Sequence, residues 1–425
     1  MDAVTARPQG DLPRLAVLYE ASSVQAFHLV EASAETWRTV WVVDRDLPGS
    51  EGVMRLLSRF GPVVDVTSMD DAEVARALRP YDISGIVAFD DSLLPRAAFV
   101  AQELALPFMS PEVTHRVTDK LAQREAFRAA GVPTPRSARI PASGTAVEWV
   151  RAAASIDFPA VAKPVSGNGS RDVYALQGFE DLVALMSTRA ARGAAGDMVV
   201  EERIPDAWVD GERPYGDFVT VETFVSHGTM SHFGVTGCMP LAEPFRLTGN
   251  FQPSALRAQD TEAAVRAAED AIRALGADTG VFHTEVKLSP VGFRVVEVNG
   301  RLGGGGVPRI AELATGRSLL NATGRVALGQ QVDVSGAEFA RVGYFYRFQP
   351  PVGARTLVSI DGLDEVRAFP GMREVVLNRR PGDALGDVSQ GTRGFIYSVH
   401  GTVDSHEALW RMMERVRTTV SVVVD

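Results

Sequence analysis

Residues 281–288 read VFHTEVKL, and residues 293–301 read FRVVEVNGR. Both runs alternate apolar and polar side chains with the period of two that is typical of β-strands. Residues 289–292 between them predict a turn, so we expect an antiparallel hairpin. One face of this hairpin would carry His283, Glu285, Lys287, Glu297, Asn299 and Arg301. The opposite face would be apolar and would carry Val286, Leu288, Val296 and Val298.

The polar face of the hairpin suits a hard cation. Magnesium prefers oxygen ligands, commonly one or two carboxylates with the rest from water and nucleotide phosphates, so Glu285, Glu297 and Asn299 form a candidate half-shell. The glycine tract at residues 303–306 follows Arg301 and exposes backbone amides that favour an anion. The alternative for the same residues is a solvated sheet face with cross-strand salt bridges.

Length and composition indicate a globular protein of about three domains, because the chain has 425 residues, 45% of them hydrophobic and 23% charged. The formal net charge of -10 and the lack of a long basic run argue against nucleic acid or an anionic membrane surface as a partner. A single cysteine, Cys238, excludes an internal disulfide and fits a reducing compartment. With no leader-like start and no membrane-length apolar run, we expect a cytoplasmic protein.

Lysine is rare in this sequence, since only three of the 43 basic residues are not arginine. Lys120 lies in the first turn of a predicted helix, where the helix dipole disfavours a cation. Lys163 ends a predicted strand and precedes a Gly/Ser loop at residues 166–170, an arrangement that suits phosphate without forming a P-loop. Lys287 is the third, and the bias suggests that these positions need a compact ammonium.

The remaining patterns divide the chain. Residues 12–112 alternate short apolar strands with helical stretches, which predicts a parallel sheet flanked by helices, and no dinucleotide fingerprint follows the first strand. After residue 328, strands among Gly and Pro turns and one helix indicate a small α+β unit. We expect residues 366–369 to form one of those strands.

The order of these motifs resembles that of the ATP-grasp superfamily over nearly the whole chain. In chain order they are Asp119-Lys120, Lys163 with its Gly/Ser loop, residues 201–204, Glu285, Glu297, Asn299 and Arg301. Residues 283–288, the glycine tract and residues 369–383 look like the bacterial L-amino acid ligases that make dipeptides. The resemblance implies an ATP-grasp fold of mixed α/β and α+β class. A Rossmann-like parallel α/β domain would span residues 1–112, an ATP-grasp domain 113–332 (lid subdomain 113–216, metal-binding subdomain 217–332), and an α+β closing domain 333–425.

The same resemblance implies roles for individual residues. ATP phosphates would be held by Lys120 and Lys163 under a lid of Ser166, Gly167, Asn168, Gly169 and Ser170. A hinge of Glu201, Glu202, Arg203 and Ile204 would contact adenine through its backbone and carboxylate, while residues 205–216 leave the ribose contact unassigned. Magnesium, or manganese, would bind Glu285, Glu297 and Asn299. Substrates would contact His283, Lys287, Arg301, Gly303, Gly304 and Gly305, and the catalytic residues would be Arg301 and Lys163.

The activity that the resemblance implies is ATP-dependent ligation of a carboxylate to an amine. Two amino-acid-like or peptide substrates would be joined through an acyl phosphate, with release of ADP and phosphate and without a protein nucleophile; Cys238 is then a buried small residue. Two alternatives stay open: another ATP-grasp activity, such as a biotin-carboxylase-like carboxylase or a purine-pathway ligase, and a nucleotide-binding protein without turnover. A homodimer is common in the resembled family. The sequence does not assign the two substrates or which of them is phosphorylated.

Overall fold

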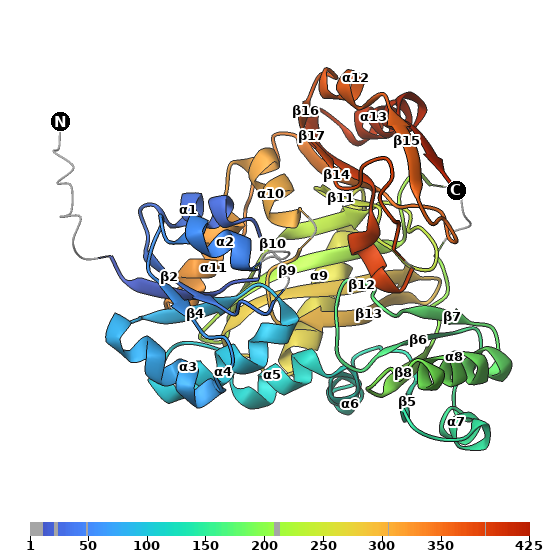
Figure 1. Cartoon of the computed structure of the whole chain (residues 1–425), viewed down its shortest axis with the longest axis horizontal. Coiled ribbons are helices and arrows are strands. Elements are labelled where there is room, and N and C mark those ends of the chain that lie inside the picture. The colour runs from blue at the N-terminus through green and yellow to red at the C-terminus, as the bar shows by residue number, and fades with distance from the viewer. Residues whose placement is uncertain (1–11, 21–23, 48–49, 208–212, 305, 387) are drawn as a thin grey trace.

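The N-terminal sheet is parallel, as predicted, with strand order β3-β2-β1-β4 (Figure 1). The computed structural model describes residues 12–20, 24–47, 50–207, 213–304, 306–386 and 388–425. The strands of this sheet are β1 (Arg14–Leu18), β2 (Arg38–Val43), β3 (Val63–Asp65) and β4 (Gly85–Ala88). The helices around it are α1 (Ala26–Ser33), α2 (Ser50–Leu57), α3 (Asp71–Leu78), η1 (Arg79–Tyr81), η2 (Asp91–Leu93) and α4 (Leu94–Leu104). Strands alternating with helices produce this layered arrangement.

A smaller antiparallel sheet follows, with strand order β5-β8-β6-β7. Its strands are β5 (Ser137–Ile140), β6 (Ala160–Pro164), β7 (Tyr174–Leu176) and β8 (Met198–Glu202). The helices of this region are α5 (Pro111–Thr118), α6 (Lys120–Ala129), α7 (Ala146–Ala152) and α8 (Phe179–Ala191). The side chain of Asp119 caps α6 by accepting hydrogen bonds from the amides of Leu121 and Ala122, and this cap fixes Lys120 in the first turn.

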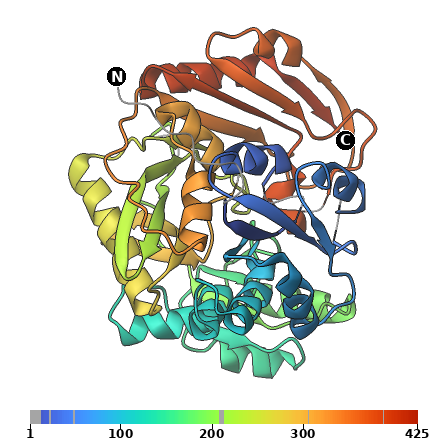
Figure 2. The same ribbon diagram turned by 90° about the vertical axis from the view of Figure 1, so that its left-hand side faces the viewer.

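The largest sheet is antiparallel, with strand order β13-β12-β9-β10-β11-β14-β17-β16. Its strands are β9 (Phe218–Ser226), β10 (Thr229–Cys238), β11 (Gly249–Gln252), β12 (Gly280–Ser289), β13 (Gly292–Asn299), β14 (Val342–Phe348), β16 (Met372–Leu377) and β17 (Tyr397–Val403). The neighbouring helices are α9 (Ala258–Ala274), α10 (Val307–Thr315) and α11 (Leu319–Ala327). Because α11 contacts β4 as well as β9 and β12, it joins the N-terminal sheet to the largest sheet (Figure 2).

The C-terminal strands β14, β16 and β17 extend the same sheet as the hairpin. The other C-terminal elements are β15 (Leu357–Asp361), α12 (Leu363–Arg367), η3 (Val388–Gly394), α13 (His406–Thr419) and β18 (Ser421–Val424), of which β15 pairs with β18. The prediction of a strand at residues 366–369 is wrong, because Val366 and Arg367 lie in α12. Leu363 and Val366 are both buried on one face of the short helix α12, and a four-residue segment that begins at Val366 cannot reveal their i, i+3 spacing.

The predicted hairpin is confirmed as β12 and β13, but one side-chain assignment on it is wrong. Glu285 lies opposite Glu297, whereas Val286 lies opposite Val295, so the register skips Val296 as a β-bulge. Val295, at 1% exposure, therefore takes the core position expected for Val296. A bulge shifts which side chains share a face, and alternation along one strand does not report it.

None of the helices in the described part of the chain is long and apolar enough to cross a membrane.

Candidate functional site

Two largely buried carboxylates lie side by side where β12 and β13 pair. Glu285 and Glu297 are direct register partners. Burial, and next the charge of Glu297, raise the pKa of Glu285. Burial also opposes ionisation of Glu297, but the charges of Lys120 and Lys163 outweigh it and lower its pKa. Like charges buried together indicate a place for a cation.

The donors at this place fit an oxygen-seeking divalent ion. Asn299, the register partner of His283, is 3% exposed and lies two residues along β13 from Glu297. Within the described residues, no group of three or more His, Cys, Asp or Glu side chains could hold a metal. A cation here would therefore take few protein ligands and complete its shell with other oxygens, which is the manner in which magnesium binds.

The lysines from the sequence analysis lie around the carboxylates. The Nζ of Lys120 is 3.0 Å from Glu297 Oε1 and donates to the carbonyl of Gly167 at 2.8 Å. The Nζ of Lys163 is 2.8 Å from Glu201 Oε2, and burial lowers its pKa. The structure thus brings Lys120, Lys163, Glu285, Glu297 and Asn299 together. Lys287 points elsewhere, since its Nζ lies 2.8 Å from Asp206 and 2.9 Å from Asp217.

Arg124 on α6 was missed in the sequence, although it organises one side of the site. Its guanidinium is 1% exposed and binds both carboxylate oxygens of Glu201, at 2.7 and 3.1 Å, and the carbonyl of Val296. Burial would raise the pKa of Glu201, but Arg124 and then Lys163 outweigh burial and lower it to about 2. An arginine on an amphipathic helix gives no sequence signal that separates it from surface arginines.

Arg301 is held by a residue that follows the N-terminal strand β4 and has no role in the sequence analysis. Asp91, which follows β4, accepts hydrogen bonds from Arg301 Nε at 2.9 Å and Nη2 at 2.7 Å through one oxygen, Oδ2. Burial disfavours the charge of Arg301, but Asp91 outweighs it and raises the arginine's pKa. The amide of Asn168 donates to Asp91 Oδ2 at 3.1 Å and to Asp90 at 3.3 Å. Two acids after a buried parallel strand are the signal that points to this edge.

His283 is also fixed by a residue that the sequence analysis missed. Its Nδ1 lies in a very short contact with Glu222 of β9, and Glu222 accepts a hydrogen bond from the amide of Gly303 at 2.8 Å. A Cβ at position 303 would come within 2.6 Å of His283 Nδ1, so this position needs glycine. Glu222 raises the pKa of His283 although burial opposes that shift. Gly304 is exposed, and Gly305 lies outside the described residues.

The Gly/Ser loop at residues 166–170 is hydrogen-bonded to the segment after β4 and to η3 in the C-terminal region. Besides the contacts of Asn168, the amide of Thr392 in η3 donates to the carbonyl of Gly169 at 2.9 Å. Ser166 and Gly167 are exposed, and the loop therefore covers the lysines from outside. Of the predicted hinge, Glu201 is buried as described, Glu202 forms an ion pair with Arg136, and Arg203 lies 2.7 Å from Asp206.

Cys238 is buried, as predicted, and burial raises the pKa of its thiol, so the thiolate that a nucleophile needs is disfavoured.

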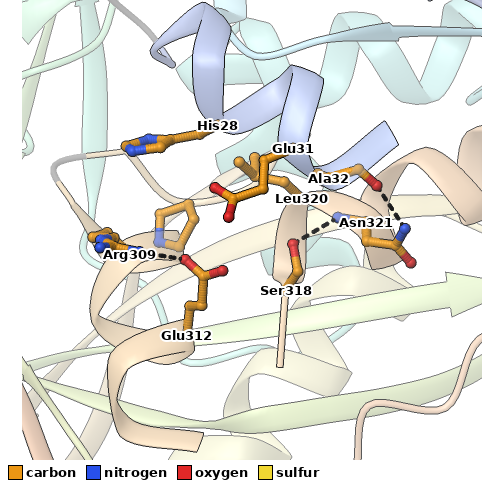
Figure 3. A pocket seen from close by; sticks show the side chains of 9 residues that line it. His28, Glu31, Ala32, Arg309, Glu312, Ser318, Leu320 and Asn321 are labelled. Carbon is orange, nitrogen blue, oxygen red and sulfur yellow. Dashed lines mark hydrogen bonds and ion pairs between the residues drawn. The ribbon is translucent and has the colours of Figure 1, made fainter. Parts of the chain in front are cut away.

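A separate cavity of about 250 Å³ lies between α1, α10 and α11 (Figure 3). His28 and Glu31 from α1 face Arg309 and Glu312 from α10, and Arg309 is 2.8 Å from Glu312. None of the site residues predicted from the sequence lines this cavity, which therefore lies apart from the paired carboxylates.

Comparison with known proteins agrees with this geometry. Residues 156–309 match the family model of the ATP-grasp domain. The chain is 31% identical over 343 residues to the uncharacterized protein y4rH from Sinorhizobium fredii, covering 76% of this chain and 65% of that protein. It is 30% identical over 276 residues to carnosine synthase 1 from Gallus gallus, covering 60% of this chain and 28% of that protein. The chain thus spans less than two thirds of the length of these curated relatives.

Among solved structures, the crystal structure of L-amino acid ligase from Bacillus licheniformis is similar, with a TM-score of 0.75, 20% identity and coverage of 97% of this chain and 99% of that one. At this identity the likeness establishes the fold. Residues 156–309 therefore match an ATP-grasp domain, and the chain as a whole has the fold of this ligase.

Proposed function

We propose that the protein is an ATP-dependent carboxylate–amine ligase, which joins two amino-acid-like substrates through an acyl phosphate and releases ADP and phosphate. The observation that carries this proposal is the largely buried pair Glu285 and Glu297, which lie side by side on neighbouring strands and are flanked by Lys120, Lys163 and Arg301. A magnesium ion bound by Glu285, Glu297 and Asn299 would neutralise phosphate oxygens during phosphoryl transfer.

Each flanking residue has a role in this proposal. Lys120 and Lys163 would exchange their present carboxylate partners for phosphate oxygens, because both are buried point charges at the base of the 166–170 loop. That loop would exclude water from the phosphates. Glu201 is already held by Arg124 and Lys163, so the backbone of residues 202–204 is the part of the predicted hinge that would contact adenine.

Arg301 would stabilise the negative charge that develops on the acyl phosphate and on the tetrahedral adduct formed by the amine. Its fixed pairing with Asp91 provides preorganisation, because a donor already held in place needs no reorientation during the reaction. His283 interacts with the charge of Arg301, and Glu222 holds both His283 and the amide of Gly303, so His283 and Gly303 would contact the substrates.

The experiment that tests the proposal is a phosphate-release screen across pairs of amino acids, with mass analysis of the products. We expect ADP, phosphate and a condensed product for at least one pair. Hydroxylamine traps the activated carboxylate, and the trapping is run with amino acids and, separately, with bicarbonate or formate. Trapping with amino acids only separates a ligase from the carboxylase and purine-pathway alternatives. Absence of ADP release with every pair would instead favour a nucleotide-binding protein without turnover.

Variants of the site connect that activity to the geometry. Glu297→Gln and Arg301→Ala should each abolish ADP release while the far-ultraviolet circular dichroism spectrum stays that of the folded protein. Lys163→Ala should weaken ATP binding in calorimetry. Turnover at the wild-type rate in either of the first two variants contradicts the assigned roles.

A further inference from the structure

A second cavity, of about 410 Å³, lies between the β10–β11 connection and the segment after β14. Its size is that of a small-molecule site. The lining includes Arg246, Pro350, Pro351, Arg355 and Leu385. Among the described residues that line it, the charged ones are the two arginines, so the cavity has a positive charge that its own walls do not neutralise.

Arg246 is the unusual member of this lining because it is 4% exposed and forms no ion pair with any described residue. Its Nε donates to the carbonyl of Glu243 at 2.6 Å, and its Nη2 donates to that of Pro350 at 2.9 Å. Burial lowers its pKa. Burying a guanidinium costs free energy unless an anion compensates it, and two carbonyls supply only dipoles.

Arg355 lies across the cavity on a fixed backbone. Its amide donates to a main-chain oxygen of Asp425 at 2.9 Å, and its carbonyl accepts from the amide of Leu385 at 2.7 Å. Its side chain is exposed and has no ion-pair partner in the described part of the chain. Pro350 and Pro351 have no N–H groups, and the two guanidinium groups are the charged donors of the lining.

The walls of the cavity are connected to the loop over the lysines. Gln349 donates through Nε2 to the carbonyl of Leu247 at 2.9 Å and to that of Thr392 at 3.3 Å. Thr392 in turn donates to Gly169. The β10–β11 connection, the segment after β14 and the 166–170 loop therefore form one hydrogen-bonded chain.

We propose that this cavity is an anion-binding site in which Arg246 and Arg355 bind a carboxylate or phosphate group of a small molecule. That group belongs either to the distal end of an acidic substrate or to a separate anion. Binding at the cavity is independent of the proposed ligase activity, because it needs neither ATP nor the paired carboxylates.

The test is calorimetry on the full chain without ATP, with inorganic phosphate and glutarate as probes. We expect wild-type protein to bind at least one probe, and Arg355→Gln to weaken that binding roughly tenfold, as loss of one charge-assisted contact does. Arg246→Gln should weaken it as well. Arg373→Gln, at an exposed arginine on β16 outside the cavity, is the matched control and should bind like wild type.

Arg246 also holds the two walls together, so Arg246→Gln is interpreted only where its unfolding curve matches that of wild type; Arg355→Gln is free of this complication. The proposal is overturned if wild-type protein binds neither probe, or if Arg355→Gln binds both as tightly as wild type.

Two kinetic experiments, a comparison of KM values and an addition of phosphate, identify the source of the anion once an active substrate pair is found. If the anion is part of a substrate, Arg355→Gln raises the KM of the acidic substrate and leaves that of a neutral one unchanged. If the anion is separate, added phosphate changes the wild-type rate with neutral substrates and has no effect on Arg355→Gln. Failure of the phosphate-release screen would overturn the ligase proposal and leave the calorimetric result standing.

Discussion

Single residues decide how the site is held before any ligand binds. The Arg124–Glu201 pair is fully enclosed, whereas Arg136, which contacts Asp157 and Glu202, has a guanidinium that is more than half exposed. An enclosed ion pair contributes little by its presence, but removal of one partner leaves an uncompensated charge in a place without water. An exposed pair loses little when it is broken.

Glu201 keeps Lys163 as a partner when Arg124 is removed, but it loses two buried hydrogen bonds. We therefore expect Arg124→Met to lower the free energy of unfolding by about 1–3 kcal/mol, measured by urea denaturation. Arg136→Met is the matched control and should leave that free energy nearly unchanged. Equal losses in the two variants would contradict the distinction between the enclosed and the exposed pair.

His400 on β17 predicts a pH dependence of stability. Burial first, and then the charges of Arg347, Arg309 and His28, lower the pKa of His400 from 6.5 to about 4, although Glu374 lies 3.8 Å from its Nδ1. Between pH 6.5 and pH 4, His400 therefore binds a proton in the unfolded chain but stays neutral in the folded protein. The free energy of unfolding should fall as the pH is lowered through this window, by up to about 1.4 kcal/mol per pH unit from this residue.

Urea denaturation at several pH values measures this slope, and His400→Gln should lack that part of it. If the NMR signal of His400 itself titrates near pH 6.5 in the folded protein, the pH dependence is wrongly assigned to His400.

At the scale of elements, the 166–170 loop is a connection held at several points. Asn168 binds Asp90 and Asp91, and Gly169 binds Thr392. We expect Asn168→Ala to speed amide hydrogen exchange within this loop and to leave β6 and β8 protected, because only the loop loses its partners. Ser166→Ala, at an exposed position of the same loop, is the control. Unchanged exchange in Asn168→Ala would mean that these contacts do not hold the loop.

The elements themselves could largely be predicted from the sequence, because period-two and helical patterns are local. The parallel N-terminal sheet and the hairpin of β12 and β13 were predicted and are confirmed. The bulge at Val296 could not be predicted, since it depends on pairing between strands. The helix α12 was mistaken for a strand because its five residues are too few to show a period.

At the scale of the whole molecule, the site draws on three sheets that are far apart in sequence. Asp91 comes from the end of the N-terminal sheet, Lys163 from the small sheet, and Glu285 with Glu297 from the largest sheet. The residues that carry a motif could be identified from the sequence. Their partners Arg124, Asp91 and Glu222 could not, because long-range packing alone brings them close.

The claim on which this account depends is that ATP energy is transferred to a carboxylate before an amine displaces the phosphate. The most direct measurement uses a substrate amino acid labelled with ¹⁸O in its carboxyl group, turned over with ATP, magnesium and the partner amine. An acyl phosphate intermediate predicts that one labelled oxygen appears in the released phosphate, because the bond between the acyl carbon and that oxygen breaks when the amine attacks. Unlabelled phosphate, or formation of AMP and pyrophosphate in place of ADP, would contradict it.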